Sequence, residues 1–159
     1  MDTNTEPTVV LVDDEEMVLT SLNAYLTLET EYNVESFTDT TDALAFIGAN
    51  PIDVIISDYL MPKMNGIEFL GKAKELQPET SRILLTGHAD KQSAIEAINQ
   101  VGLFQYIEKP WDNAALLLVI RNGCERTQLL RSLRNKISEL DEAHSNLKTT
   151  QSELIRAFL

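Results

Sequence analysis

Short, unbroken runs of apolar residues alternate along the chain with longer segments in which apolar residues recur at helical spacing. The clearest runs are Val9–Val12, Val54–Ile56 and Ile83–Leu85. Runs of this kind are typical of parallel strands that helices cover on both faces. Weaker runs predict two further strands, at Val34–Phe37 and at Tyr106–Ile107.

The segments between these strands have the apolar spacing of helices that pack on a sheet. Apolar residues three or four positions apart form the sets Val18/Leu22/Leu26, Leu44/Ile47, Ile67/Leu70/Ala73 and Ala94/Ile98/Val101. Strands that alternate with helices in this way are joined by right-handed crossovers. We therefore predict an α/β fold, a doubly wound five-stranded parallel sheet with helices on both faces.

Polar side chains follow four of the five predicted strands. Asp13 and Asp14 follow the first strand, Asp58 the third, Thr86 the fourth and Lys109 the fifth. In open parallel sheets, ligands bind just beyond the carboxyl ends of the strands, where the strand order reverses. We expect these side chains to meet at that edge of the sheet.

Three converging carboxylates need a cation or raised pKa values, because two unit charges about 4 Å apart repel by about 4 kcal/mol at an effective dielectric constant near 20. Oxygen ligands with room for water favour Mg²⁺ over zinc. A carboxylate beside Mg²⁺ can attack phosphorus and form an acyl phosphate if other groups offset the phosphoryl charge. Lys109 and Thr86 are suited to that role, as a cation and as a neutral hydroxyl.

Each of these features also has a simpler explanation when it is taken alone. The acidic run Asp13–Glu16 is compatible with a helix cap, and Asp58 with a turn before Met61–Pro62. Thr86–Gly87 and Lys109–Pro110 are compatible with an ordinary loop and a surface turn. Their occurrence at successive strand ends favours a common site instead.

Residues 7–124 resemble the receiver domain of bacterial two-component response regulators. The resemblance rests on four motifs that occur in order: Val9–Glu15, Asp58–Gly66, Leu85–Gly87 and Tyr106–Pro110. It implies a flavodoxin-like fold with strand order 2-1-3-4-5. It also implies a phosphoprotein that takes part in phosphorelay signal transduction.

The resemblance assigns roles to the acidic residues. It implies that Asp58 is the phosphoacceptor, which becomes an aspartyl phosphate. Asp14, Asp58 and the backbone carbonyl of Leu60 are then the direct Mg²⁺ ligands, and Asp13 acts mainly through water. Phosphate adds about two negative charges and three acceptor oxygens, which can shift a two-state loop.

The resemblance also implies roles for the last two motifs. Thr86 is expected to bind the phosphoryl group, Lys109 to contact it, and the Lys109–Pro110 peptide bond to be cis. Thr86 and the aromatic residue Tyr106 are the expected switch, which alters the face formed by the fourth helix, the fifth strand and the fifth helix. Tyr106 is equally compatible with a half-buried strand residue whose hydroxyl is hydrated.

From Cys124 to Leu159 there is no Gly or Pro, and the apolar residues follow a heptad pattern. Isoleucine at a with leucine at d favours a parallel dimeric coiled coil, and the polar a residues His144 and Gln151 are suited to fixing the register. Lys136 at g can meet Asp141 at e of a partner. The alternative is a helix that folds back on its own receiver or frays. The predicted dimer seam consists of Leu130, Leu133, Ile137, Leu140, Leu147, Leu154 and Phe158.

Composition fits one domain with an appendage, because the chain has 159 residues and 43% of them are hydrophobic. The net charge of −12 disfavours nucleic-acid binding by this segment. The single cysteine, Cys124, and a start without a signal peptide or membrane span lead us to expect a cytoplasmic protein. Residues 1–112 carry 6 basic and 20 acidic side chains and residues 113–159 carry 7 and 5, so a compact acidic domain is expected to give way to a helical extension near Trp111. With the resemblance and the heptad pattern, we expect a receiver at 7–124 and a coiled-coil linker at 125–159.

We therefore predict a signalling phosphoacceptor rather than a metabolic enzyme. It would take a phosphoryl group from a histidine kinase or phosphotransfer protein and pass its state through a C-terminal homodimer to an output domain or effector absent from this chain. One alternative is a degenerate receiver that acts only as a dimerisation adaptor. The other is a Mg²⁺-dependent aspartyl-phosphate phosphohydrolase, although Asp58-Tyr59-Leu60 lacks the D-x-D pattern of that class.

Overall fold

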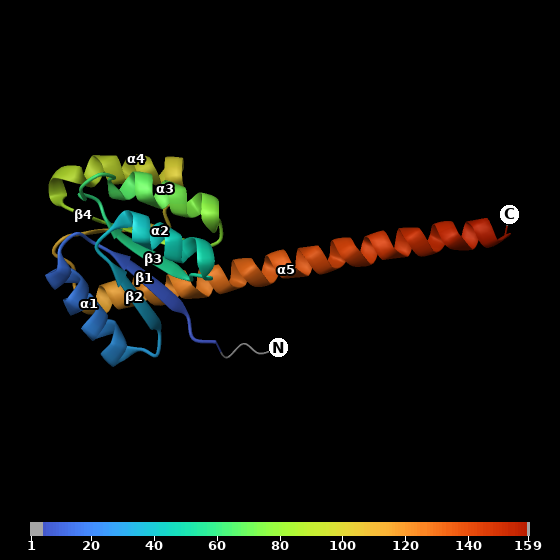
Figure 1. Cartoon of the computed structure of the whole chain (residues 1–159), viewed down its shortest axis with the longest axis horizontal. Helices are drawn as coiled ribbons and strands as arrows, with labels where there is room; N and C mark the ends of the chain where they lie inside the picture. The colour runs from blue at the N-terminus through green and yellow to red at the C-terminus, as the bar shows by residue number, and fades with distance from the viewer. Residues whose placement is uncertain (1–4, 159) are drawn as a thin grey trace. The chain divides into compact units, whose positions relative to one another are not determined.

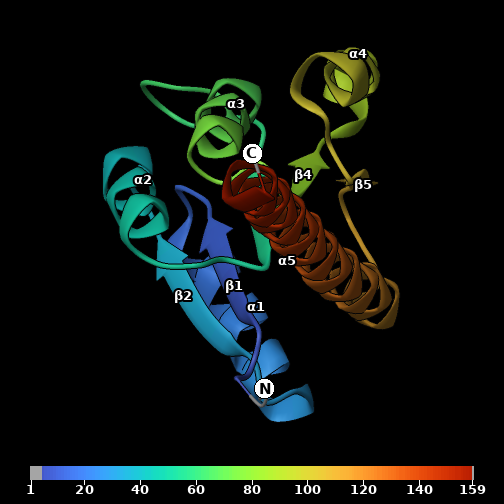
Figure 2. The ribbon, with the colours of Figure 1, turned by 90° about the vertical axis from the view of Figure 1, so that its right-hand side faces the viewer.

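The computed structural model describes residues 5–158 and contains five parallel strands in the order β2-β1-β3-β4-β5. Figure 2 shows β2 and β5 at the opposite edges of this sheet. The predicted fold class and strand order are confirmed. The strands are β1 (Thr8–Val12), β2 (Asn33–Phe37), β3 (Val54–Asp58), β4 (Ser81–Thr86) and β5 (Gln105–Glu108).

Helices cover both faces of the sheet, as the alternating pattern predicted (Figure 1). One core lies between the sheet and α2, α3 and α4, and a second lies between the sheet and α1 and the start of α5. No helix among residues 5–158 is long and apolar enough to cross a membrane. The helices are α1 (Glu16–Glu29), α2 (Thr40–Ala49), α3 (Gly66–Leu76), the short 3₁₀ helix η1 (His88–Asp90), α4 (Lys91–Val101) and α5 (Asn113–Phe158).

Neighbouring residues of the central strands contribute to opposite cores, because side chains alternate along a strand. Val54 and Ile56 belong to the core beneath α1 and α5, whereas Ile55 belongs to the core beneath α2, α3 and α4. All five residues of β3 are buried. This burial on both faces explains why the strand is an unbroken apolar run until it reaches Ser57 and Asp58.

Two details differ from the sequence prediction. Ile98 was expected in the core, but it is 37% exposed, and Ala97 is buried in α4 instead. The fourth strand begins two residues before the apolar run, at Ser81 and Arg82, which are both buried. Polar side chains at these two positions hid the start of the strand from a search for apolar residues.

The chain divides into two compact units between Thr127 and Gln128. The first unit contains the sheet and the part of α5 whose buried residues include Leu116, Ile120 and Cys124. The second unit is the remainder of α5, in which the side chains from Ser132 to Phe158 are exposed. Leu159, the last residue of the predicted linker, lies outside the described residues.

Candidate functional site

Three carboxylates meet at the carboxyl edge of the sheet. Asp58 is the last residue of β3, and Asp13 and Asp14 directly follow β1. Each of the three contributes a carboxylate oxygen to a cluster in which these atoms lie within 4.8 Å of one another. Asp13 and Asp58 are buried, whereas Asp14 is exposed. The structure therefore forms the predicted acidic site, and the site is open to solvent beside Asp14.

Within this cluster, the carboxyl group of Asp13 has a raised pKa. Its Oδ1 accepts a 2.9 Å hydrogen bond from the N–H of Glu15, whereas its Oδ2 is buried and has no hydrogen-bond partner among residues 5–158. Burial raises the pKa of Asp13 from 3.8 to about 6; the Glu15 N–H opposes this shift, and the charge of Asp58 adds to it. This Oδ2 of Asp13 is suited to bind a cation directly or to bind a water molecule that a cation coordinates.

The helix-cap explanation of the acidic run is not supported by the geometry. Helix α1 begins at Glu16, and its N-cap residue Glu15 makes no capping hydrogen bond through its side chain. The side chain of Asp13 accepts from the N–H of Glu15, the N-cap residue itself, rather than from an N–H inside the helix. Asp13 and Asp14 therefore belong to the acidic cluster, whereas Glu16 lies in the first turn of α1.

Lys109 lies against the central carboxylate. Its Nζ is 2.8 Å from Oδ1 of Asp58, which also accepts a 3.0 Å hydrogen bond from the N–H of Tyr59. Burial lowers the pKa of Lys109, but the hydrogen bond and charge of Asp58 outweigh burial, so the net pKa is raised. Lys109 therefore stays protonated as a local positive charge, and its peptide bond to Pro110 is cis, as predicted.

Thr86 occupies the strand between those that carry Asp58 and Lys109. It is the fully buried last residue of β4 and pairs with Glu108 of β5. The N–H of Lys109 donates a 2.9 Å hydrogen bond to its carbonyl. Its hydroxyl donates a 3.1 Å hydrogen bond to the carbonyl of Gly87. A new acceptor in the site would have to compete with the Gly87 carbonyl for the proton of the Thr86 hydroxyl.

Three further positions lie around this edge. Tyr106 pairs with Leu84 and is half-buried against the core beneath α2, α3 and α4, a placement that fits both a switch and an ordinary strand residue. The side chain of Leu60 is 62% exposed in the loop after Asp58. The Nδ1 atom of His88 lies 2.7 Å from a carboxylate oxygen of Glu108, a contact that sequence reasoning missed.

Gly66, which is part of the Asp58–Gly66 motif, also shapes the site, although the sequence alone did not reveal its role. A Cβ at this position would overlap the carbonyl of Asp58 and lie 2.8 Å from Cδ1 of Leu84. The Gly66 N–H donates a 2.8 Å hydrogen bond to the carbonyl of Tyr59. Asn65, which caps α3 by accepting from the N–H of Glu68, is the local signal that a helix begins here. Gly66 thus lets α3 start directly against the backbone of Asp58.

We expect Gly66→Ala to displace the backbone of Asp58 and to destabilise the fold by about 1–3 kcal/mol, the usual cost of overpacking a core. Gly71→Ala in the same helix is the matched control, because a Cβ at Gly71 meets nothing within 4 Å. Chemical denaturation measures the free energy of unfolding of both variants. A Gly66→Ala protein as stable as wild type would contradict this role.

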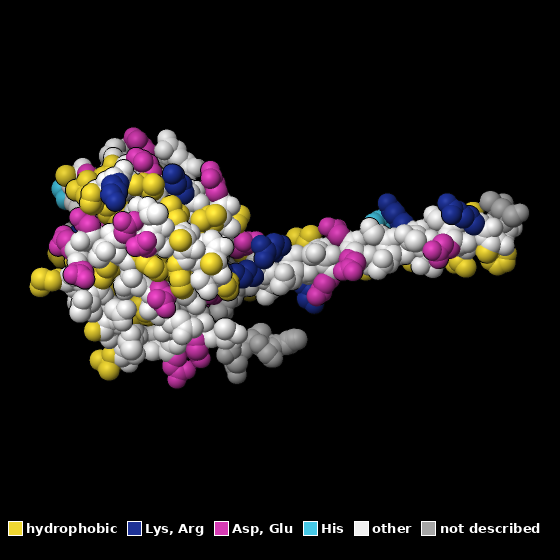
Figure 3. Space-filling view, viewed as in Figure 1, with side chains coloured by type: hydrophobic (Ala, Val, Ile, Leu, Met, Phe, Trp, Pro, Cys, Tyr) yellow, Lys and Arg dark blue, Asp and Glu magenta, His cyan; other side chains and the backbone are white. Residues whose placement is uncertain are grey.

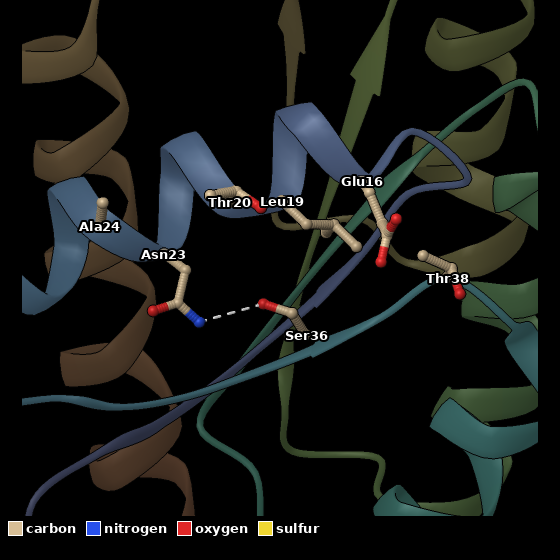
Figure 4. Close-up of a pocket in the computed structure, with 7 residues that line it drawn as sticks. All are labelled: Glu16, Leu19, Thr20, Asn23, Ala24, Ser36 and Thr38. Atoms are coloured by element: carbon tan, nitrogen blue, oxygen red, sulfur yellow. Dashed lines mark hydrogen bonds between the residues drawn. The ribbon is translucent and has the colours of Figure 1, made fainter.

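A separate groove lies between α1 and β2 (Figure 4). It has a volume of about 480 Å³, and the hydrogen bond from Asn23 to Ser36 crosses it. None of its lining residues belongs to the acidic cluster. The groove is therefore distinct from the candidate site.

The predicted seam residues of α5 present an apolar stripe to solvent. Leu133, Ile137 and Leu140 are 56%, 50% and 69% exposed, and Leu130 is half-buried. Figure 3 shows apolar side chains between charged ones on this segment. The remaining exposed members of the seam are Leu147, Leu154 and Phe158.

Comparisons with known proteins agree with this geometry. The sequence model of the family described as "Response regulator receiver domain" matches residues 9–121. The hydrogenase transcriptional regulatory protein HoxA of Cupriavidus necator is 32% identical over 148 residues, which cover 93% of this chain and 30% of that protein. The transcriptional regulatory protein FixJ of Rhizobium meliloti is 30% identical over 145 residues, which cover 91% of this chain and 69% of FixJ.

Solved structures give the same result. A response regulator receiver domain protein from Clostridium thermocellum is 32% identical, with a TM-score of 0.73, and the match covers 78% of this chain and 98% of that one. The receiver domain of an HD domain-containing protein from Pseudomonas fluorescens gives a TM-score of 0.76 at 34% identity, over 83% of this chain and 97% of that one. The chain spans less than a third of several curated relatives that it matches, including HoxA.

Proposed function

The chain belongs to the family of response regulator receiver domains, and from this premise we propose that it accepts a phosphoryl group on Asp58 and passes that state to an effector. The observation that carries the proposal is the acidic cluster of Asp13, Asp14 and Asp58 with Lys109 bonded to Asp58. Labelling of the purified chain by acetyl phosphate or phosphoramidate with Mg²⁺ is the test. Absence of labelling would refute the proposal.

The donor set fits Mg²⁺. All its side-chain donors are carboxylate oxygens, and the buried Oδ2 of Asp13 has no hydrogen-bond partner in the described part of the chain. Asp14, Asp58 and the carbonyl of Leu60 would hold the ion directly, and Asp13 would act through water. When bound, Mg²⁺ supplies positive charge for the phosphoryl oxygens.

The transfer step follows from the contacts of Asp58. Lys109 and the N–H of Tyr59 both bond to Oδ1, which leaves Oδ2 as the nucleophile. In our proposal Oδ2 attacks the phosphorus of a phosphohistidine that is protonated on its other ring nitrogen. An O–P bond forms, the N–P bond breaks with its electron pair going to the ring nitrogen, and neutral imidazole leaves. Lys109 then stabilises the charge on the phosphoryl oxygens.

The switch would begin at Thr86. A phosphoryl group on Asp58 offers strong acceptors that compete with the carbonyl of Gly87 for the Thr86 hydroxyl. Movement of Thr86 would change the loop before α4 and the surroundings of Tyr106 on β5. We propose that these two residues alter the face formed by α4, β5 and α5.

The heptad segment is proposed to pair with a second copy of this chain. The stripe from Leu130 to Phe158 is largely exposed, and Lys136 at g of one helix can meet Asp141 at e of the other in a parallel pair. We propose a receiver at 7–124 and a coiled-coil linker at 125–159 on this basis. Two relatives, HoxA and FixJ, are named transcriptional regulatory proteins, which supports the proposal that an output domain responds to the phosphorylated receiver. A histidine kinase or phosphotransfer protein is the proposed donor, and the cytoplasmic location stays a prediction.

Neither alternative function is favoured. A dimerisation adaptor does not require the ion pair between Lys109 and Asp58, and a phosphohydrolase of the D-x-D class lacks its second acid at Leu60. Fluoroberyllate, which mimics a phosphoryl group on a carboxylate, should bind the chain with Mg²⁺ if Asp58 is a phosphoacceptor. An adaptor would not bind it.

We expect the apparent dissociation constant for Mg²⁺ to rise about tenfold between pH 8 and pH 5, because a proton on Asp13, whose pKa is about 6, competes with the ion. The folded-state pKa of Asp13 exceeds its unfolded value, so folded protein binds the extra proton between pH 3.8 and about 6. The contribution of Asp13 to the free energy of unfolding should therefore rise as pH falls through that window. Calorimetric titration with Mg²⁺ at several pH values measures the first effect, and equal affinities at pH 8 and 5 would contradict it.

A further inference from the structure

A buried polar junction ties α5 to the sheet at the edge opposite the acidic cluster. Ser81 begins β4, Asp53 directly precedes β3, and Thr127 is the last buried residue of α5. The Thr127 hydroxyl lies 2.6 Å from the carbonyl of Asp53, and it accepts a 3.0 Å hydrogen bond from the N–H of Ser81. Ser81 and Thr127 are completely buried, so these bonds are shielded from water.

A second set of contacts brings the helix close to the strands. The Ser81 hydroxyl donates a 2.8 Å hydrogen bond to the carbonyl of Gly123 and accepts a 3.2 Å hydrogen bond from Arg126. A Cβ at Gly123 would lie 3.1 Å from Cγ2 of Val54, tighter than most real contacts. The last turn of α5 in the first unit is thus held by both its backbone and its side chains.

The junction shares its strands with the phosphorylation site. Strand β4 begins at Ser81 and ends at Thr86, and β3 runs from the residue after Asp53 to Asp58. Helix α5 starts four residues after Lys109 and returns along the sheet to Thr127. Because buried polar groups are costly to leave unpaired, residues 123–127 are expected to move with β3 and β4 rather than slide over them.

We propose that Ser81 and Thr127 are positioning residues that transmit the phosphorylation state to the heptad segment. By holding α5 to β3 and β4, they make the helix follow movements of the strands that carry Asp58 and Thr86. Thr127 directly precedes Gln128, at which the second compact unit begins. This inference rests on the proposed function, because it needs a phosphorylated receiver and a paired heptad segment.

The test compares the dimer dissociation constant of the full chain with and without fluoroberyllate and Mg²⁺, by sedimentation equilibrium. Thr127→Val keeps the shape of the side chain but removes the hydroxyl, and Ser81→Ala is the milder variant because it keeps the Ser81 N–H. Thr127→Ser restores the hydroxyl. Thr149→Val is the matched control, since the hydroxyl of Thr149 bonds to the carbonyl of Ser145 within α5.

In the wild type we expect the two dissociation constants to differ, and in Thr127→Val we expect their ratio to approach one while phosphoramidate labelling keeps its rate. Ser81→Ala should reduce the ratio, Thr127→Ser should restore it, and Thr149→Val should not change it. A wild-type ratio retained in both Thr127→Val and Ser81→Ala would overturn the inference. So would a wild-type chain that is labelled at Asp58 but stays monomeric or has a ratio of one, and this outcome leaves the phosphoacceptor function in place. A wild-type chain that is not labelled overturns the function and the inference together.

Discussion

Asp58→Asn should abolish labelling by acetyl phosphate or phosphoramidate and leave the fold intact. The asparagine side chain has nearly the same shape, so its oxygen can still accept the bonds that Lys109 and the N–H of Tyr59 make to Oδ1. Its amide is not a nucleophile toward phosphorus, and it removes one of the three negative charges that would hold Mg²⁺. We therefore expect no phosphoprotein and weaker Mg²⁺ binding.

Intact-protein mass spectrometry after incubation with the donor measures the labelling, and circular dichroism verifies the fold. Asp39→Asn is a matched control, because Asp39 caps α2 by accepting from the N–H of Thr41, and asparagine caps a helix equally well. This control should be labelled at the wild-type rate. Labelling of Asp58→Asn at that rate would show that the phosphoacceptor lies elsewhere.

The parts of the site that the sequence predicted are those that follow from the parallel direction of the strands. Asp13, Asp58, Thr86 and Lys109 each lie at or just beyond a strand end, and parallel strands bring such ends to one edge of a sheet. The alternation of apolar runs and helical segments was sufficient to predict this edge. Its chemistry followed from side chains that are visible in the sequence.

The parts that the sequence missed depend on how closely elements approach one another. The role of Gly66 follows from the distance between the start of α3 and the backbone of Asp58, which no pattern of residue types contains. The buried hydroxyl of Ser81 is paired because the carbonyl of Gly123, 42 positions away in the sequence, accepts its hydrogen bond. Ile98 and Ala97 are adjacent apolar residues in α4, so only the direction in which that helix faces the sheet decides which one is buried.

Leu140→Lys should raise the dimer dissociation constant by at least about 100-fold. Together with the loss of labelling in Asp58→Asn, this is the largest effect that we expect. Leu140 lies at a d position near the middle of the seam and is 69% exposed in the single chain. Two leucines lose a burial worth about 1.5–3 kcal/mol each, and each 1.4 kcal/mol is a tenfold change in the dissociation constant. The two new ammonium groups would also face each other in the seam, which adds repulsion.

Ser138→Lys separates the effect of the seam from the effect of added charge. Ser138 lies two positions before Leu140 on the same exposed segment but at a b position, outside the seam. It should keep the wild-type dissociation constant in sedimentation equilibrium. Both variants should be labelled at the wild-type rate, because Asp58 and Lys109 belong to the first compact unit. If Leu140→Lys dimerises as strongly as Ser138→Lys, the heptad stripe is not the dimer interface, and the state of Asp58 must reach its effector through the receiver itself.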